Sequence, residues 1–183
     1  MRIRKHALAL VAAAFLGSGA VQAGALEDGV QAFDQGNYAR SMTLLESPAQ
    51  AGDPRAQDYL GRLYEDGLGA IDKDAETAVD WYTRSAEQGD ALAQYNLAVM
   101  YYEGRGVAQD MEASFAWFKR SAEQGDSDAQ MQLGTMYKHG IGVEADAEKS
   151  FKWYRKSALQ GNYAAIDRMP DTCGVKNIEA RIH

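Results

Sequence analysis

The chain has 183 residues, of which 46% are hydrophobic and 25% are charged, and 26 acidic against 19 basic residues give a net charge of −7. This length is sufficient for one globular domain. An acidic chain without a basic stripe is poorly suited to binding nucleic acid or anionic membrane surfaces. Because Cys173 is the only cysteine, an internal disulfide framework is excluded; a free thiol is expected, with an intermolecular bridge as the alternative.

Residues 1–23 have the pattern of a secretory signal peptide. A basic start is followed by an apolar segment from Ala7 to Leu16 and by a small-residue site that ends at Ala23. Cleavage after Ala23 is therefore predicted; an uncleaved anchor is the alternative, although the apolar segment is short for a membrane span. Cleavage would remove three basic and no acidic residues, which leaves an exported chain, periplasmic or secreted, with a net charge of −10 and no stable membrane insertion.

Residues 24–52 form the first predicted unit, an N-terminal capping repeat that looks like a tetratricopeptide unit. Helical spacing predicts one helix from Leu26 to Phe33 and a second from Tyr38 to Ala49, with a tight connection at residues 35–37. Pro48 should bend or shorten the second helix, because proline removes a backbone donor within a helix.

Three further units repeat one pattern at an interval of 36 residues. Each contains a Trp followed by Tyr or Phe, then Ala and Gly at fixed offsets; the aromatic pairs are Trp81-Tyr82, Trp117-Phe118 and Trp153-Tyr154. A period in this range is typical of arrays in which neighbouring units stack. The predicted units are residues 53–89, 90–125 and 126–161, and residues 162–183 form a C-terminal half-repeat and tail. Trp117, in the middle unit, is expected to contact the units on both sides.

Each unit is expected to contain two amphipathic helices. In the second unit Leu60, Leu63 and Tyr64 lie at i, i+3 and i+4, and Ala78 and Trp81 begin a second series with helical spacing. An Asp precedes each helix at the N-cap position and a Gly follows it. Strand alternation is absent. The predicted fold class is therefore all-α, an α-α superhelix of antiparallel helix pairs with the aromatic pairs in the core.

The third unit shows the repeated pattern most fully, as Ala-Gln-x-x-Leu-Ala-x-Met-Tyr-x-x-Gly-x-Gly-Val from Ala93 to Val107 and Ala-Trp-Phe-x-x-Ser-Ala-Glu-Gln-Gly from Ala116 to Gly125. This pattern, repeated in one register over about residues 53–165, resembles the Sel-1-like repeat, a relative of the tetratricopeptide repeat. The resemblance implies an α-solenoid that acts as an adaptor or scaffold in protein complexes. For an exported bacterial member it implies a periplasmic adaptor or regulator, with an immunity protein that neutralises a secreted toxin as the alternative.

The resemblance also places partner binding on the concave wall, which the first helix of each pair lines in tetratricopeptide-like arrays. The predicted wall residues are Asp58, Arg62, Tyr95, Val99, Tyr102, Met131, Thr135, Lys138 and His139, with Glu65, Asp66 and Glu103 beside them. Tyr95, Val99 and Tyr102 are expected to be exposed. Together with Met131 they would anchor a partner segment, because an apolar patch with a polar rim indicates a contact site. The alternative is that neighbouring repeats cover these rings.

No catalytic, metal or cofactor site is predicted, so the protein is not expected to be an enzyme. The motifs Gly-x-Ser-x-Gly and Ser-x-x-Lys do not occur, and one cysteine with two histidines after residue 23 are too few for a zinc site. The Gly-x-Gly motifs follow predicted helices and lack a Lys-Ser/Thr ending, so they indicate helix ends rather than a phosphate-binding loop. His139 is expected at a helix C-terminus on the rim. A glycan or cell-wall peptide remains an alternative ligand.

Overall fold

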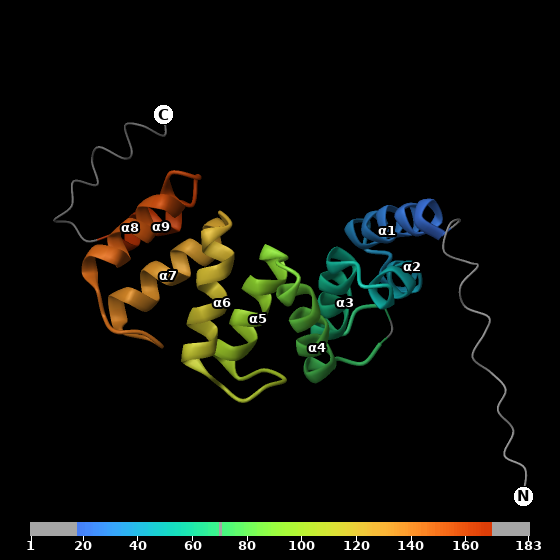
Figure 1. The fold of residues 1–183 in the computed structure, drawn as a ribbon, viewed down its shortest axis with the longest axis horizontal. Coiled ribbons are helices and arrows are strands. Elements are labelled where there is room, and N and C mark those ends of the chain that lie inside the picture. Colours follow the sequence, from blue (N-terminus) through green and yellow to red (C-terminus); the bar gives the residue numbers. More distant parts are fainter. Residues whose placement is uncertain (1–17, 70, 170–183) are drawn as a thin grey trace, which may run out of the picture.

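The computed structural model describes residues 18–69 and 71–169, with side chains from residue 24 on, and this part of the chain is helical (Figure 1). Its helices are α1 (Ser18–Asp34), α2 (Tyr38–Gln50), α3 (Pro54–Asp66), α4 (Ala75–Glu87), α5 (Ala91–Glu103), α6 (Met111–Glu123), α7 (Ser127–His139), α8 (Ala147–Ala158) and α9 (Tyr163–Arg168). Each helix packs mainly on its neighbours in sequence, so helix pairs follow one another in an arc from α1 to α9. The predicted all-α superhelix is thus confirmed. None of the helices described is long and apolar enough to cross a bilayer.

The two ends of the chain leave some predictions open. The start of the predicted signal peptide, residues 1–17, and the tail from Pro170, which includes Cys173, lie outside the described residues. The helix α1 begins at Ser18 and continues through the predicted cleavage site after Ala23. Cleavage at that site stays a prediction.

Pro48 does not shorten the second helix of the first unit, so that part of the expectation is wrong, and the predicted bend stays a prediction. The helix α2 contains Pro48 and still has 13 residues, as many as α3. Pro48 is buried and lies in the last turn of α2, next to buried Ala49. Tertiary packing of this turn offsets the backbone hydrogen bond that proline cannot make.

The helix ends in the three full repeats are set by the predicted residues. An Asp caps the N-terminus of each helix from α3 to α8, and its carboxylate accepts the amide N–H three residues later. Gly67, Gly104 and Gly140 end the first helices in the left-handed conformation, with φ between 67° and 69°. Glycine adopts this conformation without steric cost, which explains the first glycine of each Gly-x-Gly motif.

The second glycine of each Gly-x-Gly motif has a different role, which is to let one repeat touch the previous one. A Cβ atom on Gly106 would lie 2.1 Å from the carbonyl oxygen of Ala75, and one on Gly142 would lie 2.0 Å from that of Met111. Gly69 is similarly close to the start of α2. Each loop therefore packs directly on the first turn of the preceding second helix, and only glycine fits there.

Within each repeat a small residue of the first helix faces a buried ring of the second. The facing residues are Gly61 and Tyr82, Ala98 and Phe118, and Gly134 and Tyr154. A Cβ atom on Gly61 would lie only 2.5 Å from the ring of Tyr82, so the two helices approach more closely than larger residues would allow. This contact places the second aromatic residue of each pair in the core, as predicted.

The tryptophans lie nearer the surface than predicted. Trp81, Trp117 and Trp153 are half-buried, and each has the basic side chain three residues later over its ring. Trp117 packs against the core clusters of two successive repeats, so its predicted contacts on both sides are confirmed. The helical periodicity puts the fully buried stripe one residue later, on the residue that follows each Trp.

A chain of buried glutamines joins the repeats. Each of them donates its Nε2 to a carbonyl oxygen at the end of the previous repeat and accepts a hydrogen bond from a glutamine of its own second helix or cap. The buried residues are Gln57, Gln94 and Gln130, and the partners that donate to them are Gln88, Gln124 and Gln160, each at 2.8 Å. These bonds satisfy carbonyl groups that a helix end leaves unpaired.

Candidate partner-binding face

The first helices of the units, α1, α3, α5, α7 and α9, form one continuous surface, which we name the first-helix wall. Arg55 Nη1 of α3 donates to Glu27 Oε1 of α1 at 2.9 Å, and Asn96 Nδ2 of α5 donates to Asp58 Oδ1 of α3 at 3.0 Å. Of the helices two apart in sequence, α1 and α3, and α7 and α9, approach most closely. Elements on the inner side of a curved array approach most closely, so these contacts place the wall on the concave side.

Asp58 is buried, which corrects its predicted place on the open wall. Its exposed fraction is 3%, and Asn96 of the next repeat donates a hydrogen bond to it. Burial raises the pKa of Asp58 from 3.8 to about 7, and the nearby negative charge of Asp90 adds to this rise. Arg62 and the hydrogen bond from Asn96 act in the opposite direction. A carboxyl group at the joint between the second and third repeats therefore titrates near neutral pH.

Arg62 is half-buried because it packs on rings at the joint between the first and second repeats. Its guanidinium carbon lies 4.5 Å from the centre of the Phe33 ring and 5.0 Å from that of the Tyr59 ring. Such cation–π contacts stabilise the joint. The predicted binding residue thus also holds two repeats together.

A charged cluster joins the second and third repeats on the same wall. Arg105, in the loop after α5, pairs with Glu65 at 2.6 Å and with Glu103 at 2.5 Å. Glu65 also accepts a hydrogen bond from the hydroxyl of buried Tyr82 at 2.6 Å. Glu65 therefore connects the core of the second repeat to a loop of the third, and its charge is compensated before any partner binds.

Tyr95 and Val99 are half-buried, so the expectation that they are exposed is wrong. The ring of Tyr95 meets the ring of Phe118 edge-on at 5.5 Å, and Val99 packs on the same core cluster. Burial raises the pKa of the Tyr95 hydroxyl, which is consistent with this environment. Tyr102 is exposed, with 38% of its surface accessible, as expected. Packing thus partly covers two of the three residues, although the ring against Tyr95 belongs to the same repeat and not, as the alternative had it, to a neighbouring one.

In the C-terminal part of the wall, some of the predicted residues are packed and others are exposed. Met131 is half-buried against the core cluster around Tyr154, and Thr135 Oγ1 lies 3.0 Å from the Tyr154 hydroxyl. Lys138 and His139 are exposed in the last turn of α7. Lys138 Nζ donates to a backbone carbonyl of α9 at 3.4 Å. Of the predicted residues in this part of the wall, only those in the last turn of α7 offer charge to a partner.

The accessible predicted residues lie along one line, which we name the wall edge. It consists of the exposed residues in the last turns of α3, α5 and α7: Asp66, Tyr102, Glu103, Lys138 and His139. The edge changes from acidic to basic along the array, with one exposed ring at its centre. Within the residues the structure describes, no group of three or more His, Cys, Asp or Glu side chains could hold a metal ion. The arrangement can bind by charge and by contact with the ring.

Two residues of the wall were missed by sequence reasoning. Arg105 occupies the middle of its Gly-x-Gly motif, where the other repeats have Leu68 and Ile141. This exception to the repeat could have indicated its special role. Asn96 gives no such signal, because its function depends on a carboxylate in a different repeat.

A family model described as Sel1 repeat matches residues 54–90, 91–126 and 127–162. The chain belongs to the Sel1 repeat family. The resemblance inferred from the repeated pattern is thereby confirmed. Sel1 repeats form a protein-interaction scaffold that is generally non-catalytic.

Solved Sel1 repeat structures share the fold. The chain is similar to a Sel1 repeat protein from Oxalobacter formigenes, with 35% identity and a TM-score of 0.74 over 78% of this chain and 56% of that one. It is also similar to a protective antigen with this fold, present in uropathogenic Escherichia coli strains, with 36% identity and a TM-score of 0.73 over 79% of this chain and 32% of that one. A sel1-like repeat-containing protein of Acanthamoeba polyphaga mimivirus is 42% identical over 32% of this chain and 11% of its own length. The chain therefore spans less than two thirds of the length of each of these three relatives.

Proposed function

We propose that the chain is an exported periplasmic adaptor or regulator that binds a segment of a protein partner on the first-helix wall and catalyses no reaction. The observation that carries this proposal is the wall edge, where exposed groups of three successive repeats lie in one line. Membership of the Sel1 repeat family supports a scaffold role. The signal-peptide pattern of residues 1–23 supports export.

The centre of the proposed contact is Tyr102. It is the exposed ring of the wall edge, and Glu103 beside it is exposed as well. Tyrosine suits the centre of an interface because it combines a large rigid ring with a polar tip. Acidic and basic ends on either side of such a ring would fix the direction in which a partner segment binds.

The test is a single substitution, Tyr102→Arg, in the full chain. Val99 is left unchanged because it packs in the core. Partner capture from a periplasmic extract, quantified by mass spectrometry, should fall by about tenfold, since loss of an interface ring costs about 1–2 kcal/mol or more. Ala116→Arg is the matched control, because Ala116 is exposed on α6, outside the wall, and the added charge is the same.

Equal capture by both variants would show that the wall edge is not the binding site. A secreted toxin among the proteins lost with Tyr102→Arg would favour the immunity function over the adaptor. The thermal unfolding curves of both variants should match that of the parent chain, because each change affects an exposed side chain.

A further inference from the structure

The second helices carry a charge gradient that the stacking of the repeats does not require. In α4, Glu76, Asp80 and Glu87 outnumber Arg84, which gives a net charge of −2. In α6, two acidic and two basic residues cancel. In α8 one acidic residue stands against four basic ones, which gives a net charge of +3. The charges change while the buried residues of these helices stay alike, so the core does not require the charge gradient. Only the basic residue three positions after each Trp, Arg84, Arg120 or Lys156, packs on the ring of that Trp.

The same positions of the repeat can be compared one by one. Asp80 of α4 corresponds to Ala116 of α6 and Lys152 of α8. Thr83 corresponds to Lys119 and then to Arg155, and a glutamate at the helix end is replaced by Leu159 in the last repeat. The fourth repeat has thus replaced acidic or neutral groups by basic and apolar ones on one exposed face, which we name the α8 face.

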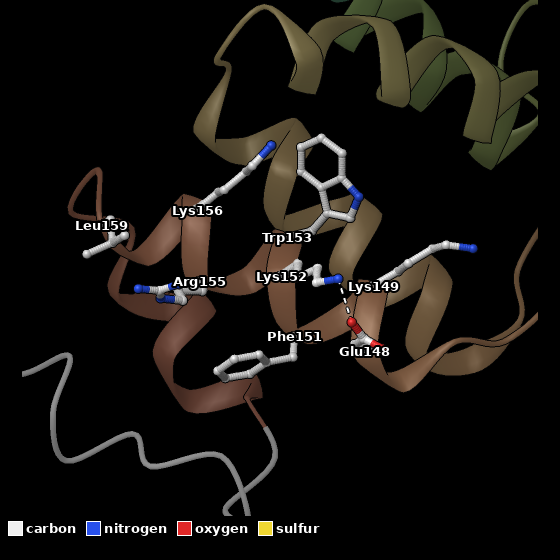
Figure 2. Close-up of a pocket in the computed structure, with 8 residues that line it drawn as sticks. All are labelled: Glu148, Lys149, Phe151, Lys152, Trp153, Arg155, Lys156 and Leu159. Carbon is white, nitrogen blue, oxygen red and sulfur yellow. Dashed lines mark hydrogen bonds and ion pairs between the residues drawn. The ribbon is translucent and has the colours of Figure 1, made fainter.

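The α8 face combines apolar with cationic groups. A half-open surface pocket of about 560 Å³ lies against it, lined by residues of α8 and its C-cap. Its lining residues are Glu148, Lys149, Phe151, Lys152, Trp153, Arg155, Lys156 and Leu159. Figure 2 shows that Phe151 and Trp153 extend to opposite sides of the helix, with Lys152 and Arg155 between them. Leu159 is 49% exposed at the end of the face.

Some of these cations are already engaged, and others are available to a ligand. Lys152 pairs with Glu148, and Lys149 pairs with Asp146 at 3.0 Å. Arg155 is exposed and makes no ion pair among the described residues. A guanidinium group in this position is suited to a carboxylate, which it can bind with two parallel hydrogen bonds.

We propose that the α8 face binds an acidic segment of a protein partner, with a carboxylate on Arg155 and apolar side chains against Phe151 and Leu159. This second contact surface goes beyond the proposed function, because it lies on a second helix and not on the first-helix wall. The chain would then bind two segments at once, one on each side of the array.

Charge favours a short acidic segment over a longer polyanion or a membrane. Residues 24–89 carry 13 acidic and five basic side chains, whereas residues 126–169 carry six of each. A bilayer or a nucleic acid would extend from the α8 face toward the acidic repeats and be repelled there. A peptide segment can contact the α8 face alone. The chain's own residues 170–183 do not complement the face, because two acidic and two basic residues cancel there.

The test measures binding of a fluorescein-labelled peptide in which glutamates flank a Leu-Phe pair, by fluorescence anisotropy with the full chain at low salt. Arg155→Glu should weaken binding by about tenfold or more, because it replaces attraction by repulsion. Lys119→Glu is the matched control, since it makes the same charge change at the equivalent position of α6, and it should weaken binding by less than about twofold. A version of the peptide with lysines in place of glutamates should not bind.

Equal loss of affinity in the two variants would overturn the proposal, because only the net charge of the chain would then matter. Absence of peptide binding to the parent chain would also overturn the proposal. Occupation of the face by residues 170–183 would prevent the peptide from binding, so it would overturn the proposal in the same way. Vesicles of phosphatidylglycerol that bind the chain through Arg155 while the peptide does not would assign the face to lipid instead. Tyr102→Arg should leave peptide binding unchanged. Failure of the proposal for the α8 face can therefore be distinguished from failure of the proposed contact at the wall edge.

Discussion

The second and fourth repeats are built on the same internal contacts, yet they differ at almost every surface position that matters for binding. Gly61 faces Tyr82 in one, and Gly134 faces Tyr154 in the other. The buried glutamines make equivalent bonds in both. The surroundings differ, since the second repeat is rich in carboxylates and the fourth is basic on α8. The comparison teaches that stacking constrains a small set of positions and leaves the others free to determine which partner binds.

The largest expected effect concerns what the two repeats share. Tyr82→Ala and Tyr154→Ala should each lower the free energy of unfolding by roughly 3–5 kcal/mol, because both rings are almost fully buried and their removal leaves a cavity. Urea unfolding followed by circular dichroism measures this loss. A cost below about 1 kcal/mol in either variant would show that the two cores are not equivalent.

The next effect concerns a position where the repeats differ, Asp58 in the second and Met131 in the fourth. The folded state raises the pKa of Asp58 from 3.8 to about 7, so between these values it holds a proton that the unfolded chain has released. Stability therefore falls as pH rises through this window, and the penalty persists above it. Asp58→Asn mimics the protonated form and should be more stable than the parent by roughly 1–4 kcal/mol at about pH 8, with little difference at about pH 4.

Thermal unfolding of the parent and of Asp58→Asn across this pH range measures the effect. Met131→Leu is the control at the equivalent position, and its difference from the parent should not depend on pH. A difference between Asp58→Asn and the parent that is constant with pH would contradict the burial of an uncharged carboxyl group.

The smallest expected effect is the difference in stability between removing the hydroxyl of Tyr82 and removing that of Tyr154. Tyr82 donates to the carboxylate of Glu65, whereas the Tyr154 hydroxyl meets the neutral hydroxyl of Thr135. Hydrogen bonds to charged groups contribute about 1.5–3 kcal/mol and neutral ones about 0.5–1.5 kcal/mol. Tyr82→Phe should therefore destabilise the fold by about 1 kcal/mol more than Tyr154→Phe, as measured by urea unfolding. Equal costs would contradict a stronger, charge-assisted hydrogen bond between Tyr82 and Glu65.

The fold could be predicted from local signals, because the residues that set it act within one repeat. Asp53 and Gly67 begin and end α3 through contacts with their own helix, so spacing alone places them. The interval of the aromatic pairs then implies stacking. These features need no knowledge of which repeat lies next to which.

The candidate site could be predicted only in part, because burial on the wall depends on contacts between different helices. Asp58 is covered through Asn96, and Tyr95 through Phe118, and neither pairing follows from the register within one helix. Tyr102 lies in the last turn of α5, beyond such contacts, and its exposure was predicted correctly. The α8 face could have been predicted from the sequence, because Asp80, Ala116 and Lys152 occupy equivalent positions of the second helices and differ in charge.

The glutamine bonds between repeats reach one unit in each direction and no further. Gln94 connects the second repeat to the third, and Gln130 connects the third to the fourth, through the same pair of atoms. A unit inserted between Gly125 and Asp126 with the same glutamines could form the same hydrogen bonds to the units on both sides. The array can therefore be lengthened one module at a time, and each insertion would move the basic C-terminal end farther from the acidic N-terminal end without redesign of either.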